Sequence, residues 1–162
     1  MDTLNQLAIE VGKVLQQRGW FLATAESITG GSISQAITAI AGSSGWFDCG
    51  FVTYSNGSKT KFLNVSEALI AQHGAVSEEV AAEMAKGTLD NTDAHITLST
   101  TGIAGPAGAV PGKPVGTVCF GWAHSKLVHN ERVVFSGDRH SVRTQTTEHA
   151  LKGLLKFIER IK

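Results

Sequence analysis

Apolar positions along the chain follow two periods, one typical of helices and one typical of strands. From Leu4 to Leu15 apolar residues recur every three or four positions, and Gly19 follows them as a residue suited to ending a helix. The helical period returns after Ser77 and after Asp138, and both residues are good N-caps. The pattern therefore predicts amphipathic helices that each offer an apolar face for packing.

Runs rich in apolar and β-branched residues lie between the helical segments and predict strands. These runs cover residues 20–25, 49–55, 95–101, 115–123 and 127–135. The short spacing between the last two runs favours an antiparallel hairpin. Helices alternating with strands predict one layered α/β domain over residues 1–162, with a mixed sheet.

Composition narrows the classes of partner. Acidic and basic residues balance at 14 each, so no global field attracts nucleic acid or an anionic membrane. No apolar run is long enough to span a bilayer, and the first 18 residues predict an amphipathic helix rather than a signal peptide. Cys49 and Cys119 lie in strand-like runs, which favours free thiols in a reduced, cytoplasmic protein. The six histidines lack metal-ligand spacing, so no metal site is expected.

Residues 41–59 hold the first candidate chemistry. Two adjacent serines, Ser43 and Ser44, precede a strand-like run that ends near Tyr54, and Lys59 follows one short turn later. Serine needs a neighbouring base to become a nucleophile, and a lysine kept neutral by burial can serve as that base. The alternative is that Ser43 caps a helical turn and Lys59 is a solvated side chain. This segment alone leaves both interpretations open.

Three other segments favour ligand binding. Thr29, Gly30 and Gly31 form a polar turn between a strand and a helix, a geometry that exposes backbone N–H groups to an anion. Residues 100–108 form a glycine-rich loop whose prolines exclude a dinucleotide or phosphate-loop motif, so it either wraps a ligand or is a flexible connection. Arg139 and Arg143 share a face at the start of the last helix, where an anion would stabilise them; the alternative is exposed arginines around a capping aspartate.

Seven motif segments, in order over almost the whole chain, resemble the CinA C-terminal domain family, whose characterised members are nicotinamide-nucleotide amidases. They include the serine pair at 43–44, the Gly-Ile-Ala-Gly-Pro motif at 102–106 and the Gly-Asp-Arg motif at 137–139. The segments are residues 24–31, 41–47, 50–56, 73–77, 101–106, 113–118 and 137–139.

This resemblance implies a three-layer α/β/α fold and hydrolysis of the carboxamide of nicotinamide mononucleotide to nicotinate mononucleotide and ammonia. It implies no metal or other cofactor, a small nucleotide as substrate, a role in salvaging pyridine nucleotides, and pairing of subunits as a family-level expectation. The chain resembles the free-standing form, because the N-terminal domain of long members has no counterpart in it.

The resemblance also implies roles for single residues. It places the nucleophile at Ser44, the base at Lys59, the family's tyrosine at Tyr54 and a hydroxyl near the reacting centre at Thr101. Neutral Lys59 would take the Ser44 proton, directly or through Tyr54, and backbone N–H groups near Ser44 would hold the oxyanion. The residues expected to bind the substrate are Thr29, Gly30, Gly31, Gly102 and Arg139.

Two departures from the family pattern keep other functions open. Gly57 and Ser58 stand where the family has an acidic residue and alanine before the lysine, and residues 107–112 lack the usual glycine-serine-acid pattern. Glycine loosens the backbone that positions Lys59. The alternatives are therefore a paralogue that binds the nucleotide without efficient hydrolysis, and a hydrolase of another small amide.

Overall fold

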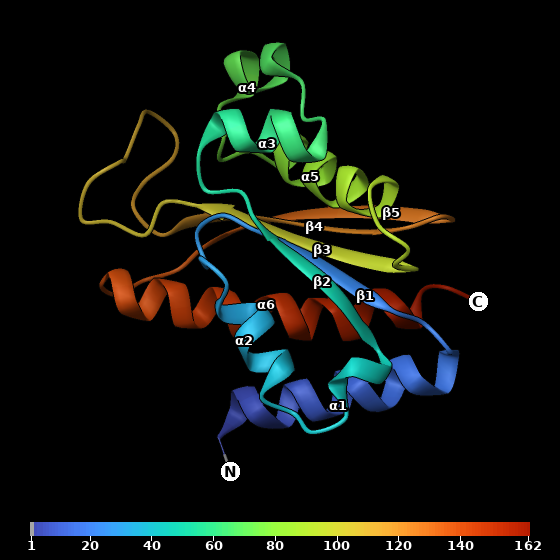
Figure 1. Cartoon of the computed structure of the whole chain (residues 1–162). Coiled ribbons are helices and arrows are strands. Elements are labelled where there is room, and N and C mark those ends of the chain that lie inside the picture. The colour runs from blue at the N-terminus through green and yellow to red at the C-terminus, as the bar shows by residue number, and fades with distance from the viewer. Residues whose placement is uncertain (1) are drawn as a thin grey trace.

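The computed structural model describes residues 2–162, which form one five-stranded sheet between two layers of helices (Figure 1). The strands are β1 (Leu22–Glu26), β2 (Phe47–Val52), β3 (Ile96–Gly102), β4 (Thr117–His124) and β5 (Leu127–Val134). The helices are α1 (Thr3–Arg18), α2 (Ser32–Thr38), α3 (Asn56–Leu63), α4 (Glu67–His73), α5 (Glu78–Asp90) and α6 (Arg139–Glu159), with a short 3-10 helix η1 (Ser43–Gly45). The three-layer α/β/α fold with a mixed sheet is confirmed.

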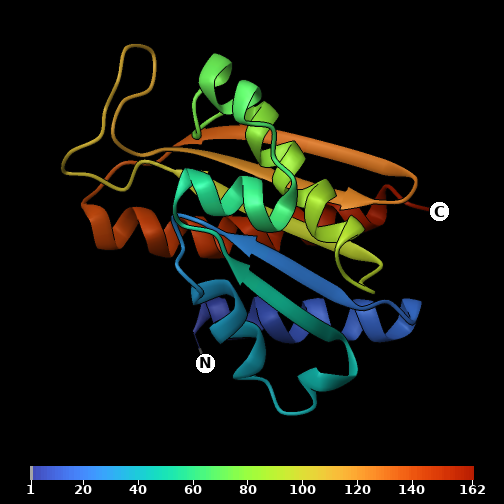
Figure 2. The same cartoon turned by 45° about the horizontal axis from the view of Figure 1, so that its top comes forward.

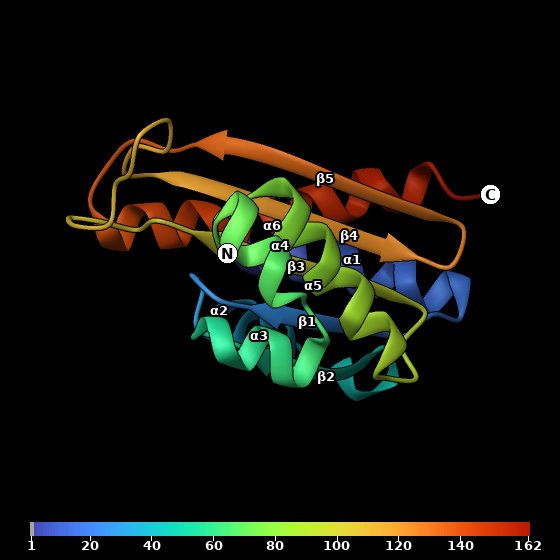
Figure 3. The ribbon, with the colours of Figure 1, turned by 90° about the horizontal axis from the view of Figure 1, so that it is seen from above.

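The strand order is β2-β1-β3-β4-β5, which Figure 3 shows from above. The strands β2, β1 and β3 are parallel, whereas β4 runs antiparallel to β3 and β5 antiparallel to β4. The predicted hairpin is therefore confirmed. After β1 the chain forms β2 on one side of β1, and it later forms β3 on the other side of β1, so the direction of the strand order reverses at β1. In open α/β sheets such a reversal marks the ligand site, outside the carboxyl ends of the strands.

The two helical layers pack closely on the sheet (Figure 2). On one face, α5 crosses β3 and β4 so closely that a Cβ on Gly121 would lie 2.3 Å from the carbonyl oxygen of Ala81. On the other face, α1 and α6 lie under the larger apolar core, where Trp122 donates its indole N–H to the Ala150 carbonyl at 3.2 Å. This packing makes the carboxyl edge of β1, β2 and β3 a rigid platform.

Helix starts agree with the predicted caps. The side chains of Ser66, Ser77 and Asp138 accept hydrogen bonds from the backbone N–H groups of residues 69, 80 and 141. Strand limits differ more: the first strand extends through Glu26 instead of ending at residue 25, and the second ends at Val52 instead of residue 55. In the described part of the chain, no helix is long and apolar enough to cross a membrane.

Candidate active site

A cavity of about 310 Å³ lies at the carboxyl edge of the parallel strands. Its walls come from the turn after β1, the segment that runs from Tyr54 into α3, the segment before α5, the end of β3 with the loop after it, and the first residue of α6. In Figure 1 this is the end of the sheet from which the loop after β3 projects. The topological reversal at β1 places these five segments together.

Lys59 is the buried cation of this cavity. Only 1% of the residue is exposed, and its Nζ atom donates to Ser27 Oγ at 3.0 Å and to the carbonyl oxygens of Thr53 and Tyr54 at 2.9 and 3.1 Å. Loss of hydration on burial lowers the pKa of Lys59 to about 8. An amine with this pKa can act as a base near neutral pH. The interpretation of Lys59 as a solvated side chain is therefore wrong.

The three partners of Lys59 fix the direction of proton transfer. The carbonyl oxygens of Thr53 and Tyr54 can only accept, so they occupy two N–H groups of the amine. The third position faces Ser27 Oγ. When Lys59 is neutral, its lone pair can occupy this position, and the Ser27 hydroxyl, which has the Tyr54 carbonyl as its other acceptor at 3.5 Å, can give its proton to Nζ. The contact has the geometry of a serine–lysine nucleophile–base pair.

Ser44, the predicted nucleophile, lies elsewhere. It is an exposed residue of η1, directly before the amino end of β2, whereas Lys59 follows the carboxyl end of the same strand. The six residues of β2 span about 20 Å at the usual rise per residue. The structure does not bring Ser44 and Lys59 together, and the predicted pair is not formed. The backbone N–H groups near Ser44 are likewise too far from Lys59 to hold the oxyanion of a substrate bound beside that lysine.

Ser27 is the hydroxyl that the sequence prediction missed. The sequence pattern predicts that the first strand ends at residue 25 and indicates only an anion-binding turn after it. Because β1 continues through Glu26, Ser27 stands directly at the carboxyl edge of the sheet. The available signal was a serine that follows a buried strand, together with a lysine that follows the next parallel strand.

Tyr54 contributes to the site through its backbone as well as its side chain. Its carbonyl accepts from Lys59 Nζ, while the residue is 65% exposed and lines the cavity. Because Lys59 contacts Ser27 Oγ directly, a relay through the phenol of Tyr54 is not required. As an exposed residue of the cavity wall, Tyr54 is available to contact a ligand.

The predicted residues of the β3 end and of α6 do meet at the cavity. Thr101, Gly102 and Arg139 all line it. Thr101 donates its hydroxyl to the Ala75 carbonyl at 2.8 Å, which joins two walls of the cavity. Arg139 donates Nη1 to the Gly105 carbonyl at 3.0 Å, and its other N–H groups can reach a ligand.

The turn residues Thr29, Gly30 and Gly31 are not among the residues that line the cavity. Thr29 is buried, and its hydroxyl shares a hydrogen bond with the Thr100 hydroxyl at 2.9 Å. Gly30 and Gly31 have φ angles of 59° and 102°, a conformation that side chains disfavour. The three residues shape the turn that presents Ser27.

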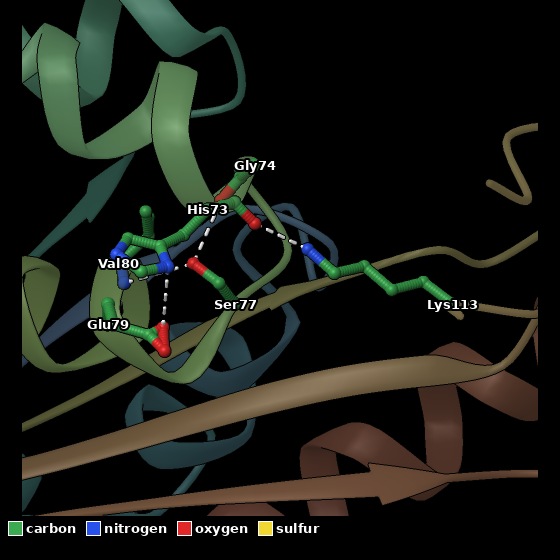
Figure 4. A network of polar contacts seen from close by, with 6 residues as sticks. All are labelled: His73, Gly74, Ser77, Glu79, Val80 and Lys113. Carbon is green, nitrogen blue, oxygen red and sulfur yellow. Dashed lines mark hydrogen bonds and ion pairs between the residues drawn. The ribbon is translucent and has the colours of Figure 1, made fainter. Parts of the chain in front are cut away.

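A network around Lys113 holds another wall in place (Figure 4). Lys113 Nζ donates to the His73 carbonyl at 2.5 Å, and Ser77 Oγ donates to the Gly74 carbonyl at 2.8 Å. His73 Nδ1 lies 3.6 Å from Glu79 Oε2. These contacts fix both ends of the short wall formed by residues 75–76. They also tie the loop after β3 to that wall, because Lys113 belongs to the loop.

A larger cavity of about 460 Å³ lies among α1, α2 and α6 and has no comparable chemistry. The hydroxyl of Ser32 in its wall bonds to the hydroxyl of Thr147 rather than to a base. Arg143 lines this cavity, while Arg139 lines the smaller one, so the two arginines do not form the joint anion site that their spacing predicted. In residues 2–162 no group of three or more His, Cys, Asp or Glu side chains could hold a metal ion.

An α/β/α domain with a serine–lysine pair at a switch point belongs to the general class of ligand-binding α/β proteins. The family model described as the CinA C-terminal domain matches residues 4–158, and the chain belongs to this family. A protein of Enterobacter agglomerans named nicotinamide-nucleotide amidohydrolase PncC is 50% identical over 154 residues, which cover 94% of each chain. The protein of that name from Escherichia coli K12 is 51% identical over 152 residues, covering 93% of this chain and 92% of the relative. By their names these relatives are hydrolytic enzymes.

Longer proteins contain the same region. A CinA-like protein of Chlorobaculum tepidum is 49% identical over 166 residues, which cover 99% of this chain and 38% of that protein. Among solved structures, the competence damage-inducible protein A of Klebsiella pneumoniae superimposes with a TM-score of 0.96 at 36% identity and covers 99% of this chain and 100% of its own. The fold is therefore the fold of the CinA superfamily.

Proposed function

We propose that this chain hydrolyses the carboxamide of nicotinamide mononucleotide, with Ser27 as the nucleophile and Lys59 as the base. The observation that carries the proposal is the 3.0 Å contact between Lys59 Nζ and Ser27 Oγ at the cavity. The names of relatives at about half identity supply the substrate. The products are nicotinate mononucleotide and ammonia.

The reaction begins with neutral Lys59. As Ser27 Oγ attacks the amide carbon, its proton passes to Lys59 Nζ, and the carbonyl oxygen becomes an oxyanion. The resulting ammonium returns the proton to the leaving nitrogen, the C–N bond breaks and ammonia departs. Water then attacks the ester on Ser27, with Lys59 accepting a proton from it and delivering one to Oγ. Nicotinate mononucleotide leaves, and the free serine is restored.

The backbone N–H of Ile28 is the donor best placed to hold the oxyanion. Ile28 follows Ser27 directly and lines the cavity, and its N–H has no hydrogen-bond partner within residues 2–162. A donor of this kind typically stabilises the transition state by about 3 kcal/mol. Ser27 therefore carries the attacking oxygen on its side chain, while the next peptide group faces the developing charge.

The cavity walls suit a phosphorylated ligand. Arg139 offers guanidinium N–H groups, and its arrangement suits a phosphate. Glycine and alanine dominate the wall formed by the end of β3 and the loop after it, which Arg139 contacts at Gly105, so backbone groups can approach a ligand closely. These small residues are Gly102, Ala104, Gly105, Ala107 and Gly108. The phosphate is assigned to the Arg139 end and the carboxamide to the Ser27 end.

The change to Gly57 and Ser58 leaves the base in position, which favours hydrolysis over binding alone. Ser55 caps α3 by accepting from the N–H of Ser58, and Ser58 Oγ donates to the Ser55 carbonyl at 2.7 Å. A Cβ on Gly57 would meet nothing within 4 Å, so a β-carbon at this position would add no packing contact. Lys59, which follows Ser58 directly, is buried, and its Nζ atom has three hydrogen-bond partners.

Ammonia release from nicotinamide mononucleotide, measured beside a thermal-shift titration, tests the proposed function. Turnover with saturation is the expected result. A thermal shift without ammonia would favour the nucleotide-binding paralogue. The absence of both ammonia release and a thermal shift would favour another small amide as the substrate.

A further inference from the structure

A fully buried carboxylate lies beneath the Ser27 turn and takes no part in the proposed chemistry. Glu26 has no exposed surface. Its Oε1 accepts from the Ile33 N–H at 2.9 Å, and its Oε2 accepts from the N–H and the hydroxyl of Ser34 at 2.9 and 2.7 Å. Burial of a charge is costly unless hydrogen bonds compensate it, and here three do so.

Glu26 caps α2 from the end of β1, because its carboxylate accepts the N–H groups that an N-cap side chain would otherwise accept. The residue before α2 is Gly31, which has no side chain to cap the first turn. The carboxylate of Glu26 takes that place, and its backbone precedes Ser27 directly. The end of β1 and the start of α2 are thereby joined across the turn of residues 27–31.

A positive side chain holds the same turn from α6. Arg143 donates Nε to the Ile28 carbonyl at 3.1 Å and Nη2 to the Thr29 carbonyl at 3.3 Å. A Cβ on Gly30 would lie 3.2 Å from Nη2, so the glycine lets the guanidinium come this close. The turn therefore lies between two anchors: Glu26, which accepts from N–H groups in the first turn of α2 directly after it, and Arg143, which donates to two carbonyl groups of the turn itself.

These contacts also orient the peptide groups next to the nucleophile. Arg143 lines the larger cavity, whereas Ser27 and Ile28 line the cavity of the proposed active site. The carbonyl oxygens of Ile28 and Thr29 are directed to Arg143, and the Ser27 carbonyl accepts from the Gly30 N–H at 3.2 Å. All three acceptor oxygens are thus engaged within the protein, and none is left to repel the oxyanion.

We propose that Glu26 and Arg143 are positioning residues that hold the Ser27 turn from opposite sides, so that Ser27 Oγ stays aligned with Lys59. This inference rests on the proposed function in that Ser27 is the nucleophile. A misplacement of about 1 Å in such a site costs on the order of a hundredfold in rate. Arg139 and the loop after β3 bind the ligand from other elements, so substrate binding is not expected to change.

The test compares Glu26→Gln and Arg143→Ala with Thr97→Val as the matched control. Thr97 is fully buried near the amino end of β3, far along the sheet from the Ser27 turn, and donates to the Ala85 carbonyl at 2.7 Å. Loss of this hydroxyl therefore weakens the fold without removing a contact of the turn. For Glu26→Gln and Arg143→Ala we expect kcat to fall by about 10- to 100-fold, with KM within about threefold of the original chain. Thr97→Val should lower the thermal midpoint and leave kcat within about twofold.

Chemical rescue separates positioning from general destabilisation. Guanidinium ion, added well below concentrations that unfold the protein, should restore part of kcat in Arg143→Ala and none in Thr97→Val. If Glu26→Gln does not fold, Ser34→Ala removes one of the three hydrogen bonds to Glu26 and should give a smaller loss of kcat. Unchanged kcat in folded Arg143→Ala, or equal loss in Thr97→Val at equal stability, would overturn the inference.

A substrate-independent readout keeps this inference distinct from the proposed function. An aryl sulfonyl fluoride reacts with an activated serine by forming an O–S bond and releasing fluoride, while the base takes the hydroxyl proton. Ser27 should be modified in the original chain and about tenfold more slowly in Arg143→Ala, whatever amide the protein hydrolyses. No amidase activity, combined with this slowing, would reject the proposed substrate and keep the positioning role. Equal modification rates would reject the positioning role.

Discussion

Two serine-containing segments flank the parallel strands at opposite edges. Ser44 lies before β2 at the amino edge, whereas Ser27 lies after β1 at the carboxyl edge. Both lie in segments that resemble motifs of the family. Only Ser27 meets a base, because Lys59 follows the carboxyl end of the adjacent parallel strand and its Nζ reaches Ser27 Oγ. Sheet direction, rather than the local motif, decides which serine can be activated.

Replacing each serine in turn gives the largest expected contrast. Ser27→Ala should lower kcat for ammonia release by at least about a thousandfold, because no other hydroxyl of residues 2–162 contacts the amine. Ser44→Ala should stay within about twofold, since Ser44 is exposed at the other edge. Circular dichroism should show both variants folded. Loss of activity in Ser44→Ala and its retention in Ser27→Ala would reverse the comparison.

Removing the base should sharpen the same contrast. Lys59→Met should lower kcat/KM by about 100-fold or more, whereas Lys61→Met, an exposed lysine of the same helix, should have little effect. Burial lowers the pKa of Lys59 to about 8, and the base must be neutral to act. Activity should therefore be full above about pH 8 and fall as the pH drops below it. A profile that is flat from pH 6 to 9 would argue against Lys59, on the general-base reasoning.

Arg139 tests whether the carboxyl edge also binds the phosphate. Arg139→Met should raise KM for nicotinamide mononucleotide by about 10- to 100-fold, the loss expected for a charge-assisted hydrogen bond. Turnover of nicotinamide riboside, which lacks the phosphate, should hardly change. The exposed Arg160 at the end of α6 is the matched control. An equal loss with both substrates would remove Arg139 as the phosphate ligand.

Replacing Lys113 tests the network of polar contacts drawn in Figure 4, and the effect should be smaller. Lys113→Met loses the bond to the His73 carbonyl, which is worth about 1 kcal/mol, so KM should rise about fivefold with kcat little changed. Lys126 is the control, because it contacts the Lys162 carbonyl at the opposite end of the sheet. Equal kinetics for the two variants would show that the wall does not depend on Lys113.

Local features of the fold could be predicted from the sequence because each depends on neighbouring residues. The caps at Ser77 and Asp138 bond within three residues, and the last two strands form a hairpin across a short turn. The resemblance to a family added the three-layer architecture. The strand ends could not be predicted as well, because polar Glu26 hides the true end of β1, whereas β-prone Thr53 and Tyr54 extend the apparent second strand beyond Val52.

The site was only partly predictable, because its contacts join residues that lie far apart in the sequence. Lys59, Thr101 and Arg139 were identified and do meet at one cavity. The partner of Lys59 lies 32 residues away in sequence, and which serine it meets depends on strand order and direction. The contacts of Lys113 and Arg143 end on backbone carbonyls, which carry no sequence signature.

Mapping the serine modified by an aryl sulfonyl fluoride, with mass spectrometry of the peptides, tests the central claim most directly. We expect modification of Ser27 that becomes faster as the pH rises toward the lowered pKa of Lys59 at about 8, and almost no modification in Lys59→Met. Modification of Ser44, or of Ser27 at an equal rate without Lys59, would contradict it.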